Sequence, residues 1–147
     1  MENSEAMSLT VALLAAAGEL VRRVNEGVAA RGFADRPAYG FAFARLSSGG
    51  ATATELAAHL GVTKQAAGQL VDELVSKGYV ERRPHPDDAR ARLVVLTDLG
   101  RASTRAAEEA AADAVRQWGD VLGEGDVRAL RELLLRIAPY GPIRPTW

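Results

Sequence analysis

The chain has 147 residues, of which 48% are hydrophobic and 25% charged, and its formal net charge is −1. This length allows one domain with a hydrophobic core, and this composition excludes general disorder. The absence of cysteine excludes disulfides and thiolate metal sites, and it fits the cytoplasmic location that we expect. No signal peptide is recognisable, and we expect no apolar run long enough to span a membrane.

Alanine and leucine dominate the apolar residues, a composition that favours helices. The first predicted helix covers residues 7–31, and its apolar stripe has three- and four-residue spacing: Leu13, Ala17, Leu20, Val21, Val24 and Val28. A turn is predicted at Asp35-Arg36-Pro37. A short helix over 38–46 follows and is broken by Ser47-Ser48-Gly49-Gly50.

Two further helices are predicted with a very short turn between them. Thr52 and Glu55 match a capping box at the start of the first helix, and Gly61 ends it. Ala57, four residues before Gly61, is small enough to lie where the two helices meet. Thr63 caps the second helix, which runs to Lys77. Its apolar residues have the spacing of one inward face: Ala67, Leu70, Val71, Leu74 and Val75.

The opposite face of this second helix is polar at its start and carries no acid in its first two turns: Lys64, Gln65, Gly68 and Gln69. The N-terminal residues of a recognition helix contact base edges in the major groove, and glutamine can pair with adenine through two hydrogen bonds. Two packed helices of an ordinary all-α protein, with a solvated polar face, would have the same pattern.

The segment after these helices predicts a β-hairpin with strands at 79–83 and 92–97 and a tip at 84–91. A helix-turn-helix followed directly by a hairpin is a winged helix. A long helix is then predicted over 98–118, a weak point over 119–125 and a last amphipathic helix over 126–138. The tail "PYGPIRPTW" contains three prolines and cannot continue this helix.

The hairpin and the preceding helices resemble the MarR family of transcriptional regulators. The family's wing motif is an acid, one residue and an arginine before a strand ending in Leu-Thr, and it matches Asp88-Ala89-Arg90 through Leu96-Thr97. "ELAAHLGVTKQAAGQLVDELVSKGYVERR" is similar to the family's helix-turn-helix. The chain departs from the family at Gly68 and Gln69, where serine and arginine are more common.

The resemblance implies a mainly α (α+β) fold, namely a winged helix-turn-helix with long N- and C-terminal dimerisation helices. It implies a single MarR-like domain over 1–147, with dimerisation helices at 8–31 and 98–139 and a DNA-binding lobe at 38–97. The implied partners are double-stranded operator DNA of near-palindromic sequence, a second copy of the chain in an obligate homodimer, and a small-molecule effector that the sequence does not identify. The implied role is that of a ligand-responsive repressor.

Two groups of residues are candidates for DNA contact. The recognition helix offers Thr63, Lys64, Gln65, Ala66, Gly68 and Gln69, and the wing offers Arg82, Arg83, Arg90 and Arg92. We expect Arg90 to enter a narrow minor groove and Asp88 to hold its guanidinium by a charge-assisted hydrogen bond. Arg82, Arg83 and Arg92 are expected to touch phosphates or to pair with acids of the same subunit.

Enzymatic chemistry finds no support in the sequence. His59 and His85 are the only histidines and are too few for zinc, so no metal site and no cofactor are expected. Neither a phosphate-binding loop nor a nucleophile with a base is recognisable. Trp118 is expected in the core or in a dimer contact. The alternative to a DNA-binding regulator is a dimeric small-molecule-binding or protein-interaction module whose winged helix no longer binds DNA.

Overall fold

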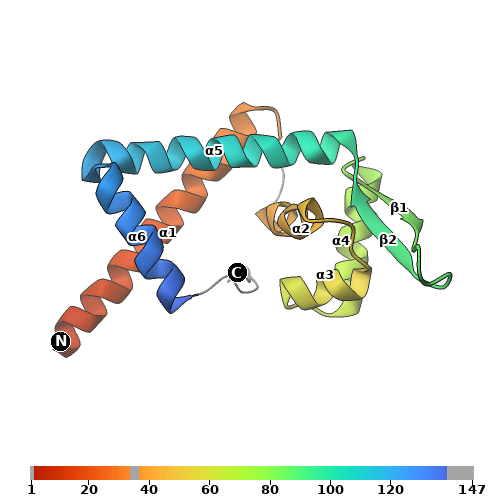
Figure 1. Ribbon diagram of the computed structural model, residues 1–147, viewed down its shortest axis with the longest axis horizontal. Helices are drawn as coiled ribbons and strands as arrows, with labels where there is room; N and C mark the ends of the chain where they lie inside the picture. The colour runs from red at the N-terminus through yellow and green to blue at the C-terminus, as the bar shows by residue number, and fades with distance from the viewer. Residues whose placement is uncertain (1, 34–36, 139–147) are drawn as a thin grey trace. The chain divides into compact units, whose positions relative to one another are not determined.

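The computed structural model describes residues 2–33 and 37–138, and their helices and strands are labelled in Figure 1. In chain order they are α1 (Asn3–Ala30), α2 (Pro37–Ser47), α3 (Ala53–Leu60), α4 (Lys64–Ser76), β1 (Val80–Pro84), β2 (Arg92–Leu96), α5 (Asp98–Leu122) and α6 (Glu124–Ile137). The mainly α fold with one small sheet is confirmed. Most of the turn predicted before α2, and the proline-rich tail, lie outside the described residues.

The described chain divides into two compact units. The first contains α1, the residues of α5 from 106 onward and α6 up to 133. The second contains α2, α3, α4, the hairpin and the start of α5, together with the last turn of α6. Each unit is described separately below.

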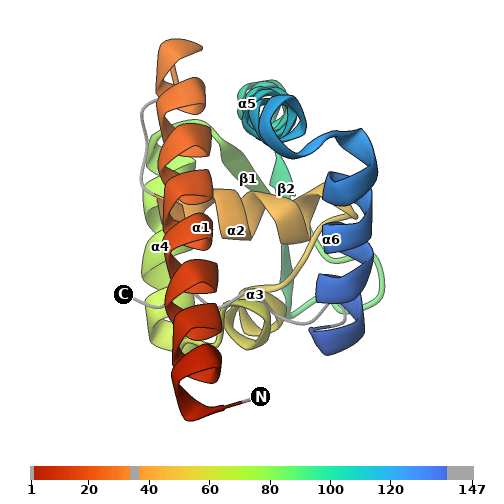
Figure 2. The same ribbon diagram turned by 90° about the vertical axis from the view of Figure 1, so that its left-hand side faces the viewer.

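Helix α1 begins at Asn3, four residues before the predicted start, and Figure 2 shows it as one uninterrupted helix. The extra turn forms because the Glu5 carboxylate accepts the backbone N–H of Glu2 at 2.9 Å, a local cap of the kind that satisfies a free helix end. None of the residues of α1 is buried. Its apolar side chains are therefore not covered within this chain.

No uninterrupted apolar run of spanning length occurs in α1, as expected, but its mean hydropathy is high over 18 residues. By length and composition alone, this helix is the one in the described chain that could cross a membrane, with a mean hydropathy of 1.4 over 18 residues. The high value arises because no charged residue lies between Glu5 and Glu19, and leucine, valine and alanine dominate that stretch. None of this window is buried within the chain.

The core of the second unit lies between α2, α3, α4 and the inner face of the hairpin. Its fully buried large side chains are Tyr39, Leu56, Val71, Leu74, Val80 and Val94. The rings of Tyr39, Phe43 and Tyr79 pack together, with centroids 5.4 to 6.3 Å apart. Aromatic side chains from α2 and from the start of the hairpin thus close one side of this core. Such burial is the main force that holds three short helices together.

The helix-turn-helix has the predicted caps. The Thr52 hydroxyl accepts the backbone N–H of Glu55 at 3.2 Å, and the Glu55 carboxylate accepts that of Thr52 at 2.8 Å. This bond from the Thr52 backbone is the main reason why the pKa of Glu55 lies below its usual value. Gly61 ends α3 with φ at +66°, a left-handed conformation that glycine adopts without strain. Ala57 is buried, as expected for the residue where the helices meet.

The two strands pair antiparallel, with Arg82 opposite Val94 at the centre of the hairpin. Val94 also exchanges two backbone hydrogen bonds with Ala51, at 2.8 and 3.0 Å, so that the segment before α3 lies along the outer edge of β2. A side chain at Gly50 would come within 2.7 Å of Leu93, which explains the glycine there. Backbone contacts therefore hold β2 against the helix-turn-helix.

The helix break at Gly123 lies inside the weak point predicted over 119–125, but three local details differ from the prediction. Helix α5 continues through Gly119 and ends at Leu122, because one glycine costs a helix only about 1 kcal/mol. Helix α6 begins at Glu124, directly after the break at Gly123. Val75 was expected to face the core, but it is 36% exposed because it lies in the last turn of α4, beyond the buried Leu74.

Candidate nucleic-acid interface

The first two turns of α4 present an exposed surface that lacks acidic side chains. Thr63 caps the helix: its hydroxyl accepts the backbone N–H of Ala66 at 3.1 Å. Burial of Ala67 and Val71 turns the other side of the helix outward, where Lys64, Gln65, Ala66 and Gln69 are exposed. The helix contains no acid before Asp72. The positive end of the helix dipole and Lys64 therefore act together on any anion that approaches.

Gly68 lies within this surface and has no steric reason to be glycine. A Cβ placed there would meet no atom within 4 Å, and the residue does not have a positive φ. Glycine in a helix interior costs about 1 kcal/mol relative to alanine. Nothing within the described chain offsets that cost.

The four wing arginines fall into two classes. Arg82 forms an ion pair with Asp72 of α4, and Arg83 donates to Glu81 at 2.6 Å. These two therefore have acidic partners within the chain, which is one of the two outcomes expected for them. Alternation along β1 explains the pairing, because Glu81 and Arg83 share one face of the strand and Arg82 shares the other with the buried Val80.

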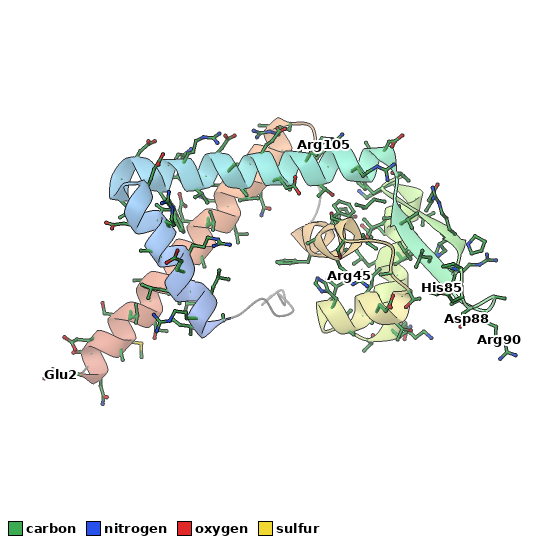
Figure 3. All side chains as sticks on the ribbon, in the orientation of Figure 1. Glu2, Arg45, His85, Asp88, Arg90 and Arg105 are labelled. Atoms are coloured by element: carbon green, nitrogen blue, oxygen red, sulfur yellow. The ribbon has the colours of Figure 1, made fainter. Side chains whose placement is uncertain are left out.

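Arg90 and Arg92 form the second class. Both are exposed, and neither makes an ion pair within the described residues. Figure 3 shows Arg90 at the very end of the hairpin, with its side chain directed away from the strands. The wing thus offers two unneutralised cations, one at the tip and one at the first residue of β2.

The role expected for Asp88 is wrong in its detail. Its carboxylate accepts the backbone N–H of Arg90 at 2.9 Å, and within the described residues it forms no ion pair with the Arg90 guanidinium. The physical reason is that residues 89–90 form a turn rather than a β-like segment, so the two side chains do not share a strand face. Asp88 therefore shapes the tip through the backbone and leaves the guanidinium available.

His85 also contributes to the tip rather than to a metal site. Its Nδ1 accepts the backbone N–H of Asp87 at 3.1 Å, and the backbone N–H of His85 donates to the Ala91 carbonyl at 3.3 Å. Within the described residues, no three histidine, aspartate or glutamate side chains are grouped so that they could hold a metal ion.

The first unit holds an open cavity of about 380 Å³ between α1 and α5. Its lining combines three small residues, Gly27, Ala110 and Ala114, with the polar residue Gln117 and four charged residues: Arg22, Arg23, Glu26 and Asp113. These charges are already paired: Arg22 and Arg23 with Glu19, and Asp113 with Arg31 at 2.7 Å. The cavity therefore has no unpaired charge that would select a charged ligand.

The sequence analysis did not predict that Asp72 of α4 forms an ion pair with Arg82 of β1. The alternation of Val80 and Arg82 along β1 was a usable signal, because it places Arg82 on the strand face that packs towards α4.

Known proteins resemble this chain over most of its length. A family model described as the MarR family matches residues 35–91, the segment from the start of α2 to the wing tip. The uncharacterised protein Rv2011c of Mycobacterium tuberculosis is 31% identical over 118 residues, which are 80% of this chain and 82% of that protein. The chain belongs to the MarR family.

Two solved structures that are similar to this chain contain DNA. A mutant of MarR from E. coli, complexed with operator DNA, is 28% identical, with a TM-score of 0.72 over 92% of this chain and 96% of that chain. The transcriptional repressor CouR, bound to a 23-mer DNA duplex, is 27% identical, with a TM-score of 0.74 over 94% of this chain and 98% of that chain. This MarR-family chain is accordingly a DNA-binding transcriptional regulator and not an enzyme.

Proposed function

We propose that this MarR-family protein is a cytoplasmic, homodimeric repressor that binds a near-palindromic operator and releases it when a small molecule binds. The single observation that carries the DNA-binding part is the acid-free, exposed start of α4 beside a wing tip with an unpaired arginine. The MarR and CouR structures with DNA are consistent with it. The response to a small molecule rests on family membership alone.

The start of α4 suits the major groove. Gln65 and Gln69 are four residues apart, so they lie on the same side of the helix, and both are exposed. Glutamine can read adenine through two hydrogen bonds, whereas Lys64 at the first helical position suits a phosphate. We assign base contacts to Gln65 and Gln69 and phosphate contacts to Lys64 and the free N–H groups of the helix end.

The wing suits the neighbouring minor groove. Arg90 has no acidic partner within the described residues, so its entry into the groove breaks no ion pair. A narrow A·T-rich minor groove concentrates negative potential and attracts arginine. Arg92 lies close enough to the tip in sequence to contact a phosphate that borders the same groove.

The dimer would cover the apolar residues that the first unit leaves exposed. Those of α1 are Met7, Leu9, Val11, Leu13, Leu14 and Val21, and Val115, Val121, Leu122 and Leu133 are exposed on the helices that follow the wing. Exposed apolar residues on this scale mark an interaction surface. Burial of α1 against a second copy of the chain would also explain why this helix is apolar, so that no membrane is needed to explain it.

Binding to DNA selected from a random pool tests this function. We expect enrichment of a near-palindrome, binding to it at least about a thousandfold tighter than to random DNA, and a steep loss of affinity with salt. Gln69→Ala should relax the preference at one base pair in each half-site, at a cost of about 1–3 kcal/mol in discrimination. Equal affinity for selected and random DNA at every salt concentration would contradict the proposal.

A further inference from the structure

The ion pair between Asp72 and Arg82 joins the recognition helix to the wing. Asp72 lies in the third turn of α4, and Arg82 is the central residue of β1. Along the chain, α4 and β1 are connected by the turn Lys77–Tyr79, where the Tyr79 N–H donates to the Leu74 carbonyl at 3.0 Å. The ion pair is thus a second connection, made further along the hairpin than this turn.

The hairpin has few other contacts that fix its angle to α4. On the inner face of the sheet, Val80, Val94 and Leu96 are buried, but Arg82, Pro84 and Arg92 on the same face are not. The backbone bonds between Ala51 and Val94 hold β2 from the side of α3. On the other strand, Arg82 lies directly opposite Val94. The Asp72–Arg82 pair therefore braces β1 at the same level at which Ala51 braces β2.

The environment of the pair suits such a brace. The Arg82 side chain is 38% exposed, so much of its stem is covered, whereas Asp72 is 71% exposed. Within the described residues Arg82 has an acidic partner and Arg90 has none. Binding of Arg82 to a phosphate would require loss of its ion pair, but binding of Arg90 requires no such loss.

We propose that Asp72 is a positioning residue, which acts through Arg82 to set the angle between the wing and the recognition helix, and that Arg82 itself does not contact phosphate. This inference rests on the proposed function, because the angle matters for simultaneous contact with a major groove and the adjacent minor groove. The spacing of those grooves is set by the DNA, so a wing at another angle loses its contact while the start of α4 keeps its own.

Operator affinity across a salt series separates a brace from a phosphate contact. We expect Asp72→Asn and Arg82→Gln each to weaken operator binding about threefold, the size expected for loss of an exposed ion pair. The slope of log affinity against log salt should be the same in both variants, because each loosens the same wing and neither removes a group that itself contacts phosphate. The double variant should be no weaker than either single variant, and the exchanged pair Asp72→Arg with Arg82→Asp should recover most of the affinity.

Arg83→Gln is the matched control, because Arg83 is the next residue on β1 and pairs with Glu81 on the other face. When Arg83→Gln is added to the Asp72 and Arg82 variants, the double variant of Asp72 and Arg82 should still bind the operator no more weakly than either single variant. Two results together would overturn the proposal. In the first, Arg82→Gln lowers the slope of log affinity against log salt by about 0.9, which is the value for one phosphate contact. In the second, Asp72→Asn strengthens operator binding.

A measurement without DNA keeps this inference distinct from the proposed function. Amide hydrogen exchange in β1 and β2 of the intact protein should be faster in Asp72→Asn and in Arg82→Gln, and normal again in the exchanged pair. Unchanged exchange in both single variants would refute the brace even if operator binding fell. If the wild-type protein fails to select any DNA sequence, the proposed function fails, and the exchange rates alone decide whether the brace exists.

Discussion

The carboxylate of Asp88 accepts the backbone N–H of Arg90 at 2.9 Å, and the Asp88 carbonyl accepts the N–H of Ala91 at 3.1 Å. One acid therefore holds the turn at the wing tip through two backbone bonds. This explains why an acid occurs at position 88 in a tip that is proposed to meet DNA. Asp88 shapes the turn, and it does not neutralise the arginine that the turn presents.

Arg90→Ala should weaken operator binding strongly and reduce the slope of log affinity against log salt by about 0.9, because one cation leaves the interface. Asp88→Ala should weaken binding less, because the arginine remains but its turn is less ordered. Asp88→Asn is the control: its side-chain oxygen can still accept the Arg90 N–H, so it should bind more tightly than Asp88→Ala. An Arg90→Ala protein with wild-type affinity would show that the wing does not contact DNA.

Gly68→Ala should raise the free energy of unfolding by up to about 1 kcal/mol, because alanine is the better helix former and the added methyl meets open space. The same change should weaken operator binding severalfold if the DNA approaches the helix closely at this position. Gly40→Ala in α2 is the matched control, since its site is equally open, and it should stabilise the protein without affecting DNA binding. Equal DNA affinity in all three proteins would exclude a close approach at Gly68.

Leu13→Glu should dissociate the proposed homodimer. Leu13 is 48% exposed on α1, and burial of a glutamate in an apolar interface is costly without a partner. Ser8→Glu, at an exposed polar position of the same helix, should leave the dimer intact. Sedimentation velocity at low micromolar concentration measures both. A wild-type protein that sediments as a stable, folded monomer would contradict the dimer itself.

Stability at acid pH should depend on Glu19. Hydrogen bonds from Arg22 and then Arg23 hold its pKa at about 2, below the ordinary value of 4.5. The charged form is favoured by folding, so this stabilisation is complete above pH 4.5 and is lost as the pH falls towards 2. Glu19→Gln should therefore flatten the fall in unfolding free energy over that interval, as measured by denaturant titration. Arg22→Gln should do the same, and wild-type curves in both variants would refute the assignment.

Much of the winged helix could be predicted because its signals are local. The Thr52–Glu55 box, the turn at Gly61 and the cap at Thr63 each involve residues no more than four apart, so sequence spacing specifies their hydrogen bonds. The apolar periodicity of α4 likewise predicted the buried face of this helix correctly as far along the chain as Leu74. These features follow from backbone geometry, which is the same in every helix.

Only the tertiary structure decided what each charged side chain does. Four arginines in one hairpin are equivalent in the sequence, yet Arg82 and Arg83 pair with acids while Arg90 and Arg92 do not, within the described residues. The Asp72–Arg82 pair depends on how α4 is rotated against β1, and the role of Asp88 depends on the conformation of the turn. Both are set by the packing of the whole unit, because a long side chain reaches partners that its neighbours in sequence do not specify.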